Sequence, residues 1–179
     1  MFSGGGDDNI AGFFRMYGGY LRDAVKGSTV TIASGYGAKF KRKVTMPRNV
    51  RQWARRYLPL AKNAAEERFM LLDLFELFEH EYGKVLDIND SPGISWWAAG
   101  VIAELDCVDE AWNATILLMW LRDHDLLQFH TVKSPMWKMS FTRWNHYAAI
   151  IQDSQGERWA IDGQYGKRPK IINTKRWYL

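Results

Sequence analysis

An α+β fold is predicted for this chain of 179 residues by three observations. Apolar side chains recur at helical spacing between Asn49 and Tyr82 and again from Cys107 to about Arg122. Beyond Leu126 the apolar residues alternate as they do in strands. A hydrophobic content of 47% with 25% charged residues is typical of one ordinary domain with a single core. We therefore expect two N-terminal helices, a third helix, and an antiparallel sheet of about four strands.

Residues 1–46 are rich in glycine and basic side chains, and we interpret them as an N-terminal arm to a domain spanning residues 47–179. The arm has no basic region followed by a long apolar run and a cleavage site, so we predict no secretory signal and a cytoplasmic location by default. The aromatic segment Ile10–Tyr20 is too short to span a bilayer. We favour a tail docked on the domain over a membrane contact.

Charge is unevenly distributed, although the net charge is only +4. The stretch Lys39–Arg56 contains eight lysine and arginine residues, whereas residues 61–110 hold three basic and twelve acidic ones. A basic stretch of this kind can meet nucleic acid or an acidic surface. Because no nucleic-acid-binding motif accompanies it, we favour a solvated arm, or one that pairs with the acidic middle of the chain, over a nucleic-acid partner.

Pro59 divides the first helical pattern into a helix around residues 50–58 and a longer one around residues 61–82. We expect Gly83 to cap the second helix. That helix has an apolar stripe and an acidic face that we expect to lie in water. The stripe comprises Phe69, Leu72, Phe75, Leu77, Phe78 and Tyr82, and the acidic face comprises Glu66, Glu67, Asp73, Glu76 and Glu79.

The third helix begins at Cys107, the only cysteine in the chain. A single cysteine excludes an intramolecular disulfide framework. Asp106 is a suitable N-cap. Backbone amides and the helix dipole favour an anion at this end, so we expect Cys107 to lose its proton more easily than an ordinary thiol. The alternative is a small buried residue that opens a core helix.

A β-hairpin is predicted further on, with Ser154-Gln155-Gly156 as its loop. Pairing Asp153 with Glu157 places Ala148 opposite Asp162. His146 then lies on the same face as Asp162 and diagonal to it, whereas a slip of one residue would put them on opposite faces. Cysteine, histidine and aspartate are what a thiol nucleophile needs: a base to take its proton and a carboxylate to orient the imidazole.

The order and spacing of these motifs resemble the transglutaminase-like superfamily of cysteine peptidases, including bacterial members. Cys107–Ala111 is similar to the C-x-[DE]-x-A helix start of that family, His146–Ala148 to its histidine strand, and Trp159–Asp162 to its aspartate strand. A glycine often precedes the cysteine and the histidine in the family, whereas Asp106 and Asn145 stand at those places here.

The resemblance covers roughly residues 96–166 and implies a papain/transglutaminase-like core, in which the nucleophile helix packs on the antiparallel sheet. It also implies a Cys107–His146–Asp162 triad that forms an acyl-enzyme on a protein or peptide substrate and releases it by hydrolysis. Transfer of the acyl group to an amine stays open. The resemblance implies no cofactor.

Three further residues are candidates for the groove around this triad: Trp96, Trp97 and Asn145. An indole N–H from Trp96 or Trp97, together with the Cys107 amide, can line an oxyanion hole, because developing negative charge needs donors already in place. Packing of both rings in the core is the alternative. Asn145 directly precedes the histidine and can flank the groove.

Two segments superficially suggest a metal. Asp87–Gly93 is rich in side-chain oxygens, but the EF-hand spacing is missing. His124 and His130, with neighbouring aspartates, offer no third ligand in a known zinc pattern. We therefore predict no metal and favour a thiol-dependent hydrolase. The rival hypotheses are an inactive module of the same fold that binds a protein partner, and an accessory protein that works through its basic stretch on nucleic acid or a membrane surface.

Overall fold

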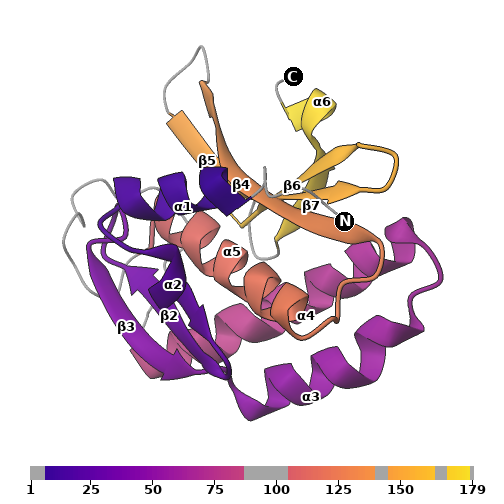
Figure 1. Ribbon diagram of the computed structural model, residues 1–179, viewed down its shortest axis with the longest axis horizontal. Helices are drawn as coiled ribbons and strands as arrows, with labels where there is room; N and C mark the ends of the chain where they lie inside the picture. The colour runs from indigo at the N-terminus through magenta and orange to yellow at the C-terminus, as the bar shows by residue number, and fades with distance from the viewer. Residues whose placement is uncertain (1–6, 87–104, 140–144, 164–168, 178–179) are drawn as a thin grey trace.

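The structure is a computed structural model that describes residues 7–86, 105–139, 145–163 and 169–177 (Figure 1). Helices and two antiparallel sheets alternate along the chain, which confirms the predicted α+β class. The N-terminal half comprises α1 (Asp7–Met16), α2 (Leu21–Ala24), β1 (Val25–Lys26), β2 (Thr29–Ser34), β3 (Phe40–Thr45), α3 (Arg48–Tyr57), η1 (Leu58–Leu60) and α4 (Ala64–Leu86). The C-terminal half comprises α5 (Cys107–Asp123), β4 (His130–Met139), β5 (Asn145–Asp153), β6 (Arg158–Asp162), β7 (Lys170–Asn173) and α6 (Thr174–Trp177).

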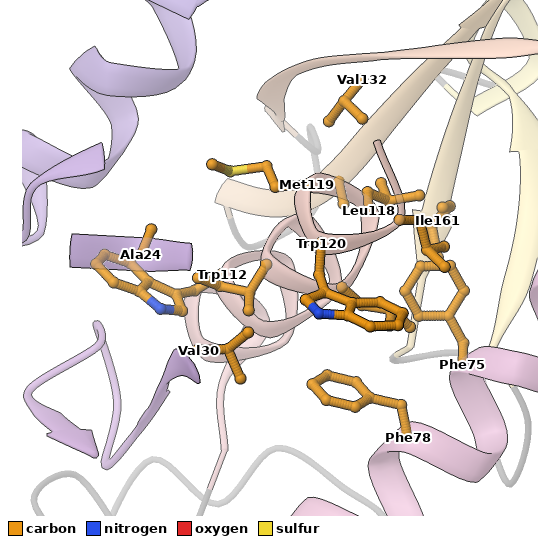
Figure 2. Packing of buried hydrophobic residues seen from close by; sticks show 14 of the residues in the cluster. Ala24, Val30, Phe75, Phe78, Trp112, Leu118, Met119, Trp120, Val132 and Ile161 are labelled. Carbon is orange, nitrogen blue, oxygen red and sulfur yellow. The ribbon is translucent and has the colours of Figure 1, made fainter. Parts of the chain in front are cut away.

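Helix α5 lies at the centre of the fold, between β2 of one sheet and β5 of the other (Figure 1). Its predicted start at Cys107 is confirmed, and it ends one residue beyond the expected Arg122. Figure 2 shows Trp112 of this helix beside Ala24 and Val30, and Trp120 facing α4. Both indole rings are almost completely buried, as are residues all around the helix. A helix covered on several sides can carry apolar residues on more than one face.

The predicted N-terminal arm contributes directly to this core. Its residues 7–45 form α1, α2 and the three-stranded sheet of order β1-β2-β3. Ile10, Phe14, Val30 and Ile32 are fully buried in the same hydrophobic cluster as α5. Burying side chains of this size contributes about 1.5–3 kcal/mol each relative to leaving them in water. The segment is therefore held to the rest of the fold by packing.

Polar contacts also fasten β2 to α5. The side-chain amide of Asn113 accepts a hydrogen bond from the Ala33 N–H at 2.8 Å and donates one to the Ala33 carbonyl at 2.9 Å. The Trp112 indole N–H donates to the Thr31 carbonyl at 2.7 Å. Because these groups are buried away from water, each pair satisfies atoms that would otherwise be costly to bury.

The break at Pro59 is confirmed, because α3 ends at Tyr57 and η1 covers Leu58–Leu60. The predicted cap at Gly83 is wrong, because α4 continues through it to Leu86. Phe69 was expected in the apolar stripe but is 69% exposed. Phe75, Phe78 and Tyr82 of the predicted stripe are buried, and Leu71 and Leu74, which the stripe left out, complete the buried face.

Glu67 was expected in water but is fully buried. Its carboxylate accepts a hydrogen bond from the Phe129 N–H at 3.1 Å and lies 2.6 Å from Nδ1 of His130. These partners compensate for the water that the carboxylate loses, which is the condition for burying a charge. The helical pattern of apolar and polar residues marks Glu67 as polar, but it contains no information about Phe129 and His130, which lie more than sixty residues further along the chain.

The four-stranded sheet has the order β4-β5-β6-β7 and is antiparallel throughout. The predicted hairpin register is confirmed: Ile150 pairs with Ala160 and Gln152 with Arg158. Gly156 closes the turn at a φ of 83°, the left-handed conformation that favours glycine. The first strand begins at His130, later than the expected Leu126. Within the described residues, no helix combines the length and apolar character needed to cross a membrane.

Candidate active site

The hairpin brings the predicted histidine and aspartate together. His146 is the second residue of β5, and Asp162 is the last residue of β6. Nε2 of His146 lies 2.8 Å from Oδ1 of Asp162. The histidine is 8% exposed and the aspartate 1%, so little water weakens the interaction between them. The register deduced from the turn is what places both side chains on one face of the sheet.

The predicted nucleophile stands at the first position of α5, and its N-cap is confirmed. Oδ1 of Asp106 accepts hydrogen bonds from the Val108 N–H at 3.0 Å and the Asp109 N–H at 2.9 Å. The Asp109 carboxylate in turn accepts from the Asp106 N–H at 3.1 Å. This reciprocal capping box, with aspartate in place of the usual glutamate, fixes where the helix begins and therefore where Cys107 lies.

The Cys107 thiol reaches the start of β5 and the end of β6. It makes a hydrogen bond with the backbone of Tyr147, the residue directly after His146, and interacts electrostatically with Asp162. The first residue of α5 thus meets the two strands at the positions that carry the histidine and the aspartate. All three residues of the predicted triad gather in one region, although 55 positions separate the first from the last.

The electrostatic environment of the thiol is the reverse of the sequence-based expectation. Burial, together with the carboxylates of Asp106, Glu110 and Asp162, raises the pKa of Cys107 to about 11, against the opposing effect of the hydrogen bond with the Tyr147 backbone. The helix dipole was expected to lower this pKa. The carboxylates of Asp106, at the N-cap, and Glu110, in the first turn, counter the positive end of the helix dipole. At neutral pH the thiol is therefore protonated.

A loop between β2 and β3 is bound to the same helix start and was missed by sequence reasoning. The Tyr36 and Ala38 N–H groups donate to the Asp109 carboxylate at 2.9 and 2.8 Å, and the Gly37 N–H donates to Oδ2 of Asp106 at 2.9 Å. Tyr36 and Ala38 adopt positive φ values of 65° and 54°, although neither is glycine. Such conformations persist only where the surroundings enforce them. The sequence signal was the pair of glycines flanking Tyr36.

Burial of Asp109, the acceptor for two of these amides, has an electrostatic consequence. The side chain is fully buried. Burial, together with the nearby Asp106 carboxylate, raises the pKa of Asp109 to about 7, against the opposing effect of the three backbone N–H groups. The group that joins the loop to the nucleophile helix therefore titrates near neutral pH, which its position in the sequence did not indicate.

Helix α1 supplies a second neighbour that sequence reasoning did not assign to the site. The Tyr17 ring, just after α1, packs edge-on against the Tyr147 ring with centroids 5.8 Å apart. Burial and a side-chain hydrogen bond with Tyr147 raise the pKa of Tyr17, and the nearby Cys107 and Asp106 act in the same direction. Its phenol consequently keeps its proton at neutral pH and can donate a hydrogen bond close to the thiol.

The remaining candidates are distributed differently. Trp96, Trp97 and the oxygen-rich segment Asp87–Gly93 lie outside the described residues. Asn145 opens β5 and pairs with Met139 of β4. The two histidines considered for zinc are engaged separately: His124 lies 2.8 Å from the Trp120 carbonyl, and His130 contacts Glu67. In the part of the chain that the structure describes, no three His, Cys, Asp or Glu residues are grouped so as to hold a metal ion.

The assembled groups provide a nucleophile, a base and an orienting carboxylate in one place. Deprotonation of the thiol depends on a base, because its own pKa is about 11. Nε2 of His146 lies 2.8 Å from the Asp162 carboxylate on the next strand, close enough for the carboxylate to orient the ring. Comparisons of this chain with protein families, with curated proteins and with solved structures find no match.

Proposed function

We propose that this protein is a thiol-dependent hydrolase that cleaves an amide or peptide bond through Cys107, His146 and Asp162. The single observation that carries the proposal is the 2.8 Å contact between Nε2 of His146 and Oδ1 of Asp162, beside the thiol at the start of α5. A buried histidine beside a buried carboxylate also occurs at His130 and Glu67, so the nearby thiol is what distinguishes His146 and Asp162. His146 directly precedes Tyr147, whose backbone bonds to the thiol of Cys107, and this neighbourhood supports the chemical role that we propose for it.

The proposed reaction begins with a neutral thiol. The sulfur of Cys107 attacks the carbonyl carbon, and the thiol proton passes to His146 as the S–C bond forms. Because Nε2 faces Asp162, Nδ1 is the nitrogen that takes this proton. The tetrahedral intermediate then expels the amine, which receives the proton from Nδ1 as the C–N bond breaks. Water cleaves the resulting thioester, returns the thiol, and leaves a carboxylic acid.

A protonated resting thiol distinguishes this scheme from one with a preformed thiolate and imidazolium pair. With a pKa of about 11, only about one thiol in ten thousand is ionised at pH 7. If the thiol proton passes to His146 while the sulfur attacks the substrate, the reaction does not depend on the small population of Cys107 thiolate. The base therefore controls the rate of acylation, and loss of His146 should slow the reaction rather than merely shift its pH dependence.

The substrate that we propose is a protein or peptide, as the resemblance to transglutaminase-like peptidases implies. An amine in place of water would resolve the same thioester by acyl transfer. Both outcomes require the acyl-enzyme on Cys107, so detection of this intermediate tests the mechanism before the natural substrate is identified.

The test is acylation by p-nitrophenyl acetate, followed by the release of p-nitrophenol and by the intact mass of the protein. We expect a rapid burst at neutral pH and one acetyl group on Cys107. Cys107→Ala should abolish the burst, and His146→Ala should slow it by about 10²–10⁴-fold, the usual contribution of a positioned base. Asp162→Asn should slow it less, since the aspartate acts through the histidine.

A matched control is His80→Ala, because His80 is an exposed histidine of α4. This variant should react like the wild type. The proposal is overturned if Cys107 is acylated at the same rate in His146→Ala as in the wild type, provided that both variants retain the same circular dichroism spectrum. It is also overturned if the acetyl group is found on lysine side chains and not on Cys107.

A second candidate function is an inactive module of the same fold that binds a protein partner. The observation that favours it is the raised pKa of the thiol, since burial and three carboxylates disfavour the thiolate that catalysis must generate. In that case His146 and Asp162 would be a structural pair. Equal acylation rates in the wild type and His146→Ala, with a normal fold, would support this candidate over the hydrolase.

A further inference from the structure

A basic surface on α3 and the adjacent strand β3 plays no part in the proposed hydrolase. Between Asp23 and Glu66 the chain has no acidic residue and ten lysine or arginine residues. Strand β3 is an edge strand and is mostly exposed, and helix α3 follows it after two residues, at the periphery of the fold (Figure 1). We define the α3 basic surface as the exposed cations Lys39, Lys43, Arg48, Arg55 and Arg56.

Part of the basic stretch Lys39–Arg56 faces the acidic middle of the chain, because Lys41 interacts electrostatically with Asp109. Among the described residues, none of the five cations of the α3 basic surface takes part in an ion pair. Other cations of the stretch bond to backbone carbonyls: Lys41 donates to the Ala38 carbonyl and Arg42 to the Val85 carbonyl. Within the described part of the chain, no carboxylate neutralises the positive charge of the α3 basic surface by an ion pair.

The geometry of α3 selects the kind of partner. Arg48 and Arg55 are seven residues apart, two helical turns, so they lie on one stripe with a spacing of about 10 Å. Val50 and Ala54, on the opposite side, are fully buried against the core. Because its apolar side is already covered, α3 cannot insert into a bilayer as an interfacial helix does. A soluble polyanion is the partner that fits a rigid row of arginines.

Aromatic side chains lie beside Arg56, at the other edge of the exposed face of α3 from Arg48 and Arg55. Tyr57 is 37% exposed, the Arg56 guanidinium lies 5.4 Å from its ring centroid, and the half-buried Trp53 ring is 5.1 Å from it. Arginines that pair with phosphates, next to rings on which bases can stack, are the combination found in proteins that bind single-stranded nucleic acid. We propose that the α3 basic surface binds the phosphate backbone of single-stranded nucleic acid, with Tyr57 as a stacking platform.

The test is fluorescence anisotropy of a labelled single-stranded oligonucleotide with the full chain, over a series of salt concentrations. Affinity should fall linearly with the logarithm of salt concentration. In Arg48→Gln/Arg55→Gln the affinity should be lower and the slope smaller by about 1.4, since each lost phosphate contact removes about 0.7 on a single strand. Glutamine preserves helix propensity, so the fold should survive.

The matched control is Arg158→Gln/Arg176→Gln, which removes two exposed cations from β6 and α6 and changes the net charge equally. Helix α6 lies on the far side of the molecule from α3 (Figure 1). The control should keep the wild-type salt slope. Tyr57→Ala should weaken binding of the single strand by about tenfold, while leaving the slope unchanged.

Several results would overturn the proposal. One is the absence of oligonucleotide binding at low salt. Another is an equal loss of affinity in Arg158→Gln/Arg176→Gln and in Arg48→Gln/Arg55→Gln, which would mean that only the net charge of the protein matters. Tighter binding of the matching duplex than of the single strand would contradict the stacking role of Tyr57. Displacement of the oligonucleotide by poly-glutamate as readily as by unlabelled oligonucleotide would assign the surface to an acidic protein instead.

Discussion

Replacing Asn113 by leucine should detach the N-terminal sheet from the central helix. Asn113 is 1% exposed and exchanges two hydrogen bonds with the backbone of Ala33 in β2. Leucine has a similar volume but leaves a buried N–H and a buried carbonyl without partners. Each such group costs about 1–3 kcal/mol, so the free energy of unfolding should fall by about 2–6 kcal/mol.

The assay is equilibrium unfolding in urea, followed by tryptophan fluorescence and circular dichroism. With a slope of about 2–3 kcal/mol per molar urea for a protein of this size, the midpoint should fall by about 0.7–3 M. Thr115→Val on the same helix is the matched control. Thr115 is also fully buried, but its hydroxyl donates to the Ala111 carbonyl, which keeps its ordinary helix bond. Loss of the Thr115 hydroxyl should lower the free energy of unfolding by about 1 kcal/mol or less.

The reasoning is refuted if Asn113→Leu and Thr115→Val shift the midpoint equally. That result would mean that β2 can satisfy its buried backbone groups without Asn113, and that the sheet is held by packing alone. Separate transitions for the two probes in Asn113→Leu would instead show local detachment of the N-terminal sheet. Detachment is consistent with the predicted role of this amide.

Three further predictions concern pH, a buried carboxylate and the thiol. Because the pKa of Asp109 rises from 3.8 to about 7 on folding, the native state binds more protons over that interval, and the stability contributed by this group should fall as pH rises through it. Glu67→Gln should lower the free energy of unfolding by about 1–3 kcal/mol, because an amide NH₂ group cannot accept the hydrogen bonds that one carboxylate oxygen takes from the Phe129 N–H and from Nδ1 of His130. Alkylation of Cys107 by iodoacetamide should be slow at pH 7 and should accelerate in Glu110→Gln, which removes one carboxylate that raises the thiol pKa.

Each of these has a control on the same element. Asp109→Asn should abolish the fall in the urea midpoint between about pH 4 and about pH 7, and a persistent fall would assign it to another group. Asp73→Asn, on the exposed side of α4, should leave stability nearly unchanged where Glu67→Gln does not. Asp123→Asn, at the far end of α5, should leave the alkylation rate unaltered, whereas an equal acceleration in both variants would point to net charge and not to Glu110.

Short-range patterns in the sequence were sufficient for much of the candidate site. The hairpin register follows from one turn, because Asp153 and Gly156 define its geometry and strand pairing then fixes every later pair. The start of α5 follows from the N-cap at Asp106, which acts on amides two and three residues away. Both features depend on neighbours within a few positions, which a single sequence displays directly.

What the sequence by itself determined is therefore the α+β class, the helix that begins at Cys107, and the face shared by His146 and Asp162. Only the tertiary structure decided that residues 7–45 build part of the core, that Glu67 is buried, and that the pKa of Cys107 rises. The physical reason is that burial and charge are set by groups brought together from distant parts of the chain. Desolvation of a thiol or a carboxylate depends on what covers it, and no local pattern records that.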